Sequence, residues 1–258
     1  VFNHQWGAAL ARAGRTDSAA RLFSRMLGQP ASLRARGLRS LAHLAIWQQR
    51  PAQAIPLLRE ALPLEERAKA GATTVVRTRL LLAVMLDRAG DSLAARVQRD
   101  SVVQRAEQLG LQEPLLYYLL GKEQVRRAQL REARTTMARV QRVLVPANRR
   151  HLAMRLLMQA ELDAAGAQWG AARARADSGI ALDSTTLTLD TRAYVLRRYV
   201  EWLASTRSDA NMLATARREA RDADVLLAAR REFGWEGTLV SAEARARLAG
   251  GTASAPEK

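Results

Sequence analysis

The sequence contains no cysteine, and only 5% of its 258 residues are aromatic. The lack of cysteine excludes disulfide bridges, thiolate zinc sites, cysteine-bound iron–sulfur clusters and a cysteine nucleophile. Long apolar runs are absent as well, because charged residues interrupt every stretch well before the roughly 18 apolar residues that a membrane-spanning helix needs. We therefore expect no cysteine redox chemistry and no transmembrane helix.

The sequence also lacks the patterns that accompany enzyme chemistry. Its three histidines, His4, His43 and His151, are far apart and do not have metal-ligand spacing. No phosphate-binding loop, dinucleotide fingerprint or nucleophile elbow is present. Carboxylate pairs such as Glu65-Glu66 stand in polar contexts, where solvation explains them. We predict a non-catalytic protein with no metal and no cofactor.

The chain begins with Val1, and no basic segment followed by an apolar segment, as in a secretory signal, is visible there. We expect further sequence upstream. The composition leaves the compartment open, with the cytoplasm slightly favoured.

Positive charge is in excess and unevenly distributed. The chain has 41 basic and 25 acidic residues, giving a net charge of +16. Residues 1–59 and residues 121–176 each contribute +8 of this excess, and the rest of the chain is balanced. Such a field favours acidic partners, nucleic acid or anionic surfaces. Only three basic residues are lysine, so the codon composition of a GC-rich genome is an alternative explanation for the arginines.

Similar segments recur along the chain. The segment around Gly14 places an alanine five residues later and Phe23 nine residues later. When this frame is laid over the later segments, the equivalent alanines stand at 19, 54, 95, 133 and 171, in steps of 35, 41, 38 and 38 residues. A period of this size predicts stacked supersecondary units, none of which can bury its apolar face alone.

Each unit has the pattern of two antiparallel α-helices. Apolar residues recur three and four apart, as in Trp6, Leu10 and Ala13, and a polar turn such as Gly14 to Asp17 follows. Gly7 and Ala19 are small enough to let two helices approach closely. Pro56 is expected to remove a hydrogen bond from its helix or to kink it.

The pattern divides the chain into three parts. We expect about five helical units over residues 1–182, a C-terminal helix pair with a capping helix over residues 183–248, and a flexible tail over residues 249–258. Residues 184–190 are expected to be a connector before helices over residues 191–206 and 209–233. A short helix is possible over residues 241–248.

The units resemble tetratricopeptide repeats (TPR). In the first unit, the residues that match the preferences of this family are Trp6, Gly7, Leu10, Gly14, Ala19, Phe23 and Leu27. The resemblance covers residues 1–182, but Arg99 and Arg175 stand where the family usually has an aromatic residue, and the units are longer than usual. It implies an all-α solenoid of about five to six antiparallel hairpins that form a right-handed superhelix. A related helical-hairpin solenoid remains an alternative.

The resemblance also implies a binding surface, because the first helix of each TPR unit lines a concave groove. The residues that this frame places in the groove are His4, Arg12, Arg36, Arg39, His43, Trp47, Arg77, Asp87, Arg88, Tyr118, Lys122 and Arg126. Arginines beside aromatic rings could hold an acidic peptide through paired carboxylates and cation–π contacts. Alternatively, the arginines only solvate this face and Trp47 packs at a helix end.

We therefore predict a protein-interaction scaffold that binds a protein or acidic peptide in a basic groove, as part of a larger bacterial signalling or regulatory protein. Two other functions remain open. The densest basic stretch contains Arg127, Arg131 and Arg134, and it could track the phosphates of a nucleic acid, although few aromatic residues are present to stack on bases. The array could also serve self-association; the sequence does not fix the oligomeric state.

Overall fold

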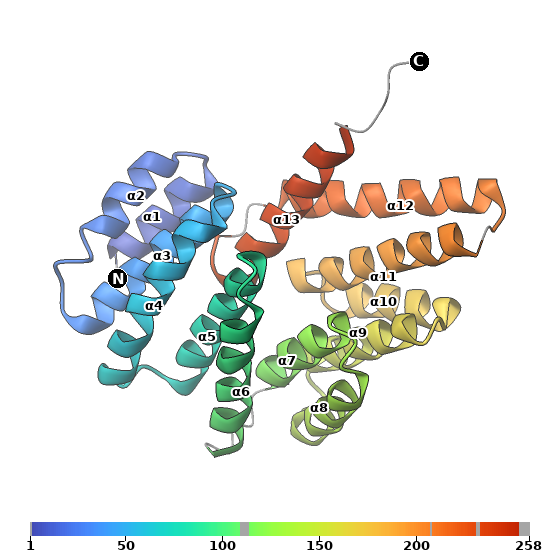
Figure 1. Cartoon of the computed structure of the whole chain (residues 1–258), viewed down its shortest axis with the longest axis horizontal. Helices are drawn as coiled ribbons and strands as arrows, with labels where there is room; N and C mark the ends of the chain where they lie inside the picture. Colours follow the sequence, from blue (N-terminus) through green and yellow to red (C-terminus); the bar gives the residue numbers. More distant parts are fainter. Residues whose placement is uncertain (1, 109–113, 207, 231–232, 253–258) are drawn as a thin grey trace. The chain divides into compact units, whose positions relative to one another are not determined.

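A computed structural model describes residues 2–108, 114–206, 208–230 and 233–252 (Figure 1). The chain divides into two compact units. Unit 1 comprises residues 1–111 and 231–243, and unit 2 comprises residues 112–230 and 244–258. The expected boundary at residue 182 lies inside unit 2.

The described residues form α-helices and contain no strand. The helices of unit 1 are α1 (Phe2–Arg12), α2 (Thr16–Ser24), α3 (Ala31–Trp47), α4 (Pro51–Arg67), α5 (Ala72–Arg88) and α6 (Ser92–Gln108). The helices of unit 2 are α7 (Pro114–Arg126), α8 (Leu130–Val143), α9 (Arg149–Ala165), α10 (Trp169–Leu182), α11 (Thr186–Ser205) and α12 (Ala210–Ala229). The first half of α13 (Trp235–Thr252) belongs to unit 1 and the second half to unit 2.

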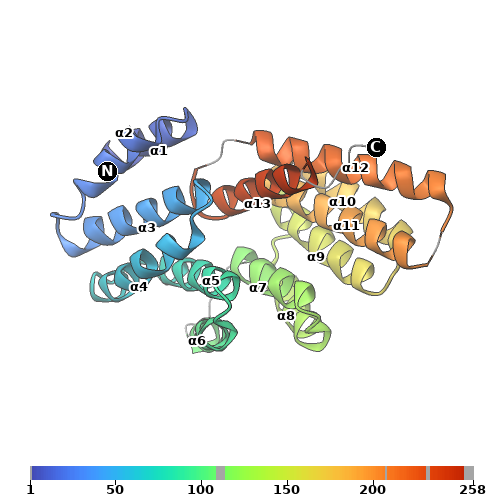
Figure 2. The same ribbon diagram turned by 45° about the horizontal axis from the view of Figure 1, so that its top comes forward.

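Consecutive helices pair into hairpins, and the hairpins stack within each unit. In unit 1 the pairs are α1–α2, α3–α4 and α5–α6, with α2 packed on α3 and α4 on α5. In unit 2 the pairs are α7–α8, α9–α10 and α11–α12, and α9 also packs on α7 and on α11 (Figure 2). The predicted all-α repeat of antiparallel hairpins is therefore confirmed.

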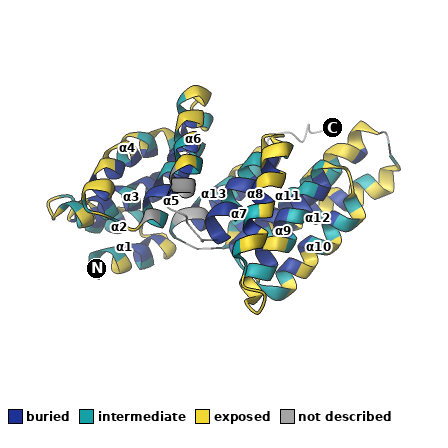
Figure 3. Cartoon of the chain, turned by 90° about the horizontal axis from the view of Figure 1, so that it is seen from below, coloured by how far each residue is buried: buried dark blue, intermediate teal, exposed yellow. Residues whose placement is uncertain are grey.

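The buried residues lie where neighbouring hairpins meet, and the exposed residues lie on the outward faces of the helices (Figure 3). One core cluster of unit 1 joins Ile46 of α3, Leu58 of α4 and Met85 of α5, and it includes Ala242 of α13. The first half of α13 is thus part of the core of unit 1, which the sequence pattern did not predict.

The turns inside the hairpins share one backbone conformation. Gly14 and Gly90 have φ of +79° and +84°, the left-handed conformation that glycine adopts most easily. Gln49, Ala128 and Ala167 adopt it without being glycine, with φ of 62°, 59° and 56°. The left-handed residue therefore recurs in each of the first five hairpins.

This turn corrects the frame of the fifth repeat. The sequence alignment placed Gly166 in the turn and Ala171 in the core, but the left-handed residue is Ala167. Five residues later Ala172 is fully buried, and Ala176 occupies the position of Phe23. The expected frame was therefore wrong by one residue. The repeats had been aligned on Gly166, which immediately precedes the left-handed residue Ala167.

The position of Phe23 is filled differently in each repeat. Phe23 and Leu58 are fully buried there, and Arg99 of α6 is buried with an ion pair to Asp87. Arg175, expected at this position in the fifth repeat, is instead a partly exposed partner of Asp163. The repeats are thus alike in backbone but not in the side chains that fill the core.

A glycine at Ala128 is expected to stabilise the chain by about 1 kcal/mol, because a left-handed conformation costs roughly 1–2 kcal/mol for a residue that carries a Cβ. Ala128 is exposed, so the substitution removes no buried contact. The matched control is Ala138→Gly at an exposed position inside α8, which should instead destabilise by about 0.5–1 kcal/mol. Urea unfolding measures the change in the free energy of unfolding for both variants. Equal destabilisation by the two substitutions would contradict this assignment of the turn.

Glycine also lies where helices cross closely. A Cβ on Gly7 would collide with the ring of Phe23, and one on Gly121 would collide with the side chain of Met158. The close approach expected at Gly7 is therefore present between α1 and α2, and Gly121 permits a similar approach of α7 to α9.

The expected connector at residues 184–190 is mostly helical. Thr185 caps α11, its backbone N–H donating to Thr188 Oγ1 at 2.9 Å, while its own side chain accepts from the backbone of the first turn. This reciprocal capping outweighs the low helix propensity of the threonines. Asp209 similarly caps α12, which ends at Ala229 rather than at residue 233.

The remaining expectations concern α4 and the C-terminus. α4 continues through Pro56 and through Pro63. The expected short helix at residues 241–248 is the middle of the longer α13. The expected tail lies partly in α13 and otherwise, from residue 253, outside the described residues. Within the described chain, no helix is both long and apolar enough to cross a membrane.

Candidate binding surface

A polar pocket of about 180 Å³ lies on the face of unit 1 formed by the first helices of its hairpins. We call it the unit 1 pocket; its lining residues are His4 of α1, Arg39, Ser40 and His43 of α3, Thr74 and Arg77 of α5, and Phe233 and Gly234. Helical spacing explains the contribution of α3, because residues three and four apart project from one face. Four residues expected in a groove, His4, Arg39, His43 and Arg77, are thus together.

Positive charge is in excess around this pocket. Arg39 forms an ion pair with Glu65 of α4, whose side chain is buried. Burial lowers the pKa of Arg39, and the guanidinium groups of Arg36 and Arg77 lower it further, although Glu65 opposes them. Burial lowers the pKa of His4 as well, with Arg36 and Arg39 adding to the shift. The site therefore favours a further negative charge, which would relieve the repulsion among its cations.

His43 forms the inner wall of the pocket. Its side chain is 5% exposed, and burial, reinforced by Arg39 and His4, lowers the pKa of the imidazole to about 3. His4 Nδ1 lies 3.0 Å from Ser40 Oγ, one helical turn before His43 on α3. His43 is thus neutral at physiological pH, and the positive charge of the site comes from its arginines.

An aromatic residue from the distant end of the chain contributes to the same face. The ring of Phe233 stacks on Phe23 at a centroid distance of 5.6 Å, meets the edge of His43 at 6.1 Å and lies 6.5 Å from Trp47. Trp47 is half-buried. The unit 1 pocket thus combines cationic groups with an aromatic wall.

The other groove residues expected in unit 1 lie beside this pocket rather than in it. Arg36 acts on it through its charge, and Arg12 is exposed at the end of α1. Arg88 forms an ion pair with Glu243 of α13, and Asp87 is the partner of Arg99. Part of the expected groove is therefore engaged by charged groups of the chain itself.

The expected groove residues of unit 2 belong to a buried charge network. Lys122 Nζ lies 2.5 Å from Asp190 Oδ2, and Arg126 Nη2 lies 3.0 Å from the same oxygen and 2.8 Å from Glu161 Oε1. The Tyr118 hydroxyl is 3.1 Å from that of Thr191.

Burial alone would raise the pKa of Asp190 and lower that of Lys122. The attraction between the opposite charges reverses both shifts, so both groups remain ionised in the interior. Because Tyr118 and Lys122 are buried and Arg126 is paired twice, we leave these three residues out of the proposed binding surface.

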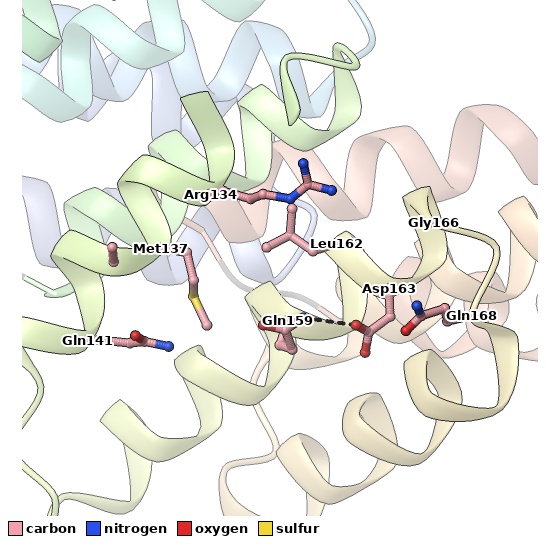
Figure 4. A pocket seen from close by; sticks show the side chains of 9 residues that line it. Arg134, Met137, Gln141, Gln159, Leu162, Asp163, Gly166 and Gln168 are labelled. Carbon is pink, nitrogen blue, oxygen red and sulfur yellow. Dashed lines mark hydrogen bonds between the residues drawn. The ribbon is translucent and has the colours of Figure 1, made fainter. Parts of the chain in front are cut away.

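The alternative basic patch comprises Arg127, in the turn after α7, and Arg131 and Arg134 of α8. Arg127 forms an ion pair with Glu123 one turn earlier, and Arg131 and Arg134 are exposed. Arg134 borders a pocket of about 390 Å³ between α8 and the α9–α10 hairpin (Figure 4). There Gln159 Nε2 donates to Asp163 Oδ1 at 2.9 Å. Apart from Arg134, amides and apolar groups line this pocket. A surface that follows a phosphate backbone needs a row of positive groups, and this pocket provides one arginine.

Sequence reasoning missed four residues that line the unit 1 pocket, namely Ser40, Thr74, Phe233 and Gly234. Ser40 could have been found, because it lies one turn from Arg36 on the same helix. Thr74 and Phe233 could not, since Thr74 carries no charge or repeat signature and Phe233 lies far away in the sequence. No group of acidic, histidine or cysteine side chains suited to a metal ion occurs among the residues that the structure describes.

Comparisons with known proteins reveal a distant structural likeness. No protein-family model matches the sequence, and no curated protein matches it. Among solved structures, the chain is similar to the C-terminal part of a TPR repeat-containing protein from Cytophaga hutchinsonii, with 13% identity, 86% of this chain and 95% of that chain covered, and a TM-score of 0.31. A likeness of this degree carries no argument about function, so function is inferred below from the residues of this chain.

Proposed function

We propose that unit 1 is a protein-interaction module that holds an acidic peptide segment of a partner against the unit 1 pocket. The observation that carries the proposal is the convergence of guanidinium groups: Arg36, Arg39 and Arg77 act on one small site, where Arg39 pairs with Glu65. Guanidinium groups bind carboxylates through paired hydrogen bonds, so aspartate and glutamate side chains are the expected ligands.

The aromatic wall gives the same segment a second contact. Trp47 and Phe233 lie beside the cations, with Phe233 stacked on the buried Phe23, and an apolar or aromatic side chain of the partner would pack against these two partly exposed rings. Acidic residues flanking such an apolar residue are therefore the pattern that the site fits best. No metal, cofactor or covalent step is required for this function.

The substitution Arg36→Glu should weaken the binding of such a peptide by about tenfold or more, since a hydrogen bond to a charged group contributes roughly 1.5–3 kcal/mol. The probe is a fluorescein-labelled peptide of aspartate and glutamate around one central phenylalanine, titrated with the full chain and followed by anisotropy. Arg36 is preferred to Arg39 because Arg39 holds the buried Glu65 and its loss would disturb the fold.

Arg59→Glu provides the matched control, because Arg59 is an exposed arginine of α4 in the same unit. It changes the net charge by the same amount and should leave the affinity nearly unchanged. Equal weakening by both variants, or no binding of the peptide by the unmodified chain, would contradict the proposal. Tighter binding of a single-stranded DNA of equal charge, insensitive to Arg36→Glu, would instead favour the nucleic-acid alternative.

A further inference from the structure

A second cationic pocket lies in unit 2, and none of the residues expected to bind a partner lines it. It has a volume of about 350 Å³ and lies where α11, α12 and the second half of α13 meet. Four guanidinium groups and two carboxylates line it: those of Arg197, Arg217, Arg221, Arg247, Glu201 and Asp224. We call it the arginine pocket. Its lining therefore carries more positive than negative charge.

The floor of this pocket is a preformed cluster of charges. Asp224 is 6% exposed and accepts hydrogen bonds from Arg197 Nη1 at 2.8 Å and from Arg247 Nη2 at 2.8 Å. Two guanidinium groups thus share one buried carboxylate, which fixes their positions. Burial lowers the pKa of Arg197 and the nearby Arg247 lowers it further, although the carboxylates of Asp190 and Asp224 oppose them.

The rim of the pocket adds cations that the carboxylates do not balance. Arg217 and Arg221 are exposed and lie one turn apart on α12, so they project from the same face. Glu201 already bonds to Arg198, which does not line the pocket. An anion with two negative charges would match the two exposed guanidinium groups of the rim, Arg217 and Arg221.

The remaining lining residues, Val200, Ala220 and Leu248, are apolar. The volume of about 350 Å³ lies within the range of roughly 300–1,000 Å³ that small-molecule sites occupy, and such sites combine apolar walls with a few polar groups. A ligand with a doubly charged head and an apolar body would use both parts of this lining.

We propose that the arginine pocket binds a small organic phosphomonoester. At neutral pH such a phosphate carries a charge near −2 and three acceptor oxygens, and planar guanidinium groups match it with paired hydrogen bonds. The apolar wall receives the organic group. This inference does not depend on the proposed function of unit 1, because the two pockets share no residue.

The test is calorimetric titration of the full chain with phenyl phosphate at low ionic strength. Saturable binding is expected, weakened about tenfold or more by Arg217→Gln together with Arg221→Gln. Both residues are exposed, so the thermal unfolding midpoint of this variant should match that of the unmodified chain. Phenyl sulfate, a monoanion of the same shape, should bind about tenfold more weakly than phenyl phosphate.

The matched control is Arg142→Gln together with Arg155→Gln, which removes the same charge from exposed positions of α8 and α9 that line neither pocket. Its affinity for phenyl phosphate should stay within about twofold of that of the unmodified chain. Absence of binding, equal weakening by the two variant pairs, or equal affinity for phenyl sulfate would each overturn the proposal.

Discussion

Replacing Asp190 by asparagine is expected to lower the free energy of unfolding by about 3–5 kcal/mol, the cost of leaving a buried charge without its partner. Asp190 is 1% exposed and holds Lys122 at 2.5 Å and Arg126 at 3.0 Å. Asparagine keeps the shape of the side chain, so the loss reports the charge rather than a cavity. Urea unfolding followed by far-ultraviolet circular dichroism measures it.

Two further variants isolate the cause. Asp177→Asn removes an exposed carboxylate that pairs with Arg192 in the same unit, and it should cost at most about 1 kcal/mol. Adding Lys122→Met to Asp190→Asn should restore part of the lost stability, because the unpaired ammonium is then absent. If Asp190→Asn destabilised the chain no more than Asp177→Asn, the buried network would not have the importance that its geometry implies.

Acid is expected to destabilise unit 1 through His43, by about 2 kcal/mol between pH 6.5 and pH 5. Burial lowers the pKa of His43 to about 3 in the folded chain, whereas an unfolded histidine titrates near 6.5. Below about pH 6.5 the unfolded state therefore binds a proton that the folded state does not bind. The stability present above pH 6.5 is lost progressively as the pH falls toward 3.

His43→Gln tests this assignment, since glutamine does not titrate. Denaturant unfolding measured at several values between pH 6.5 and pH 5 should show a shallower pH dependence in the variant than in the unmodified chain. Most carboxylates remain ionised between pH 6.5 and pH 5, so their contribution to the pH dependence of stability is small. Identical slopes for the two proteins would show that His43 accepts a proton without unfolding and that its site is open to water.

The fold was largely predictable from the sequence because hairpin repeats rest on local signals. Helical spacing, the turn at Gly14 and the small residue Gly7 act over a few positions, and the structure uses them as expected. The errors arose where tertiary contacts or helix capping determine the local backbone structure. Ala167 takes the left-handed turn although Gly166 stands beside it, and Thr185 starts a helix in a stretch of poor helix formers.

The candidate site was predictable only in part. The helical period of α3 places Arg39 and His43 on one face. This placement can be predicted from the sequence of α3 alone. The partners of these groups were not predictable, since Glu65 lies in the following helix and Phe233 comes from the far end of the chain. For the same reason Lys122 was expected on a surface, although Asp190 pairs with it in the interior.

Photo-cross-linking directly locates a partner bound at the unit 1 pocket. The acidic peptide, carrying a benzophenone in place of its central aromatic residue, is irradiated with the full chain, and the adducts are mapped by mass spectrometry. We expect adducts in α3 and α5, around Arg39 and Arg77, that disappear with Arg36→Glu. Adducts concentrated in unit 2, or adducts unaffected by that substitution, would contradict the claim.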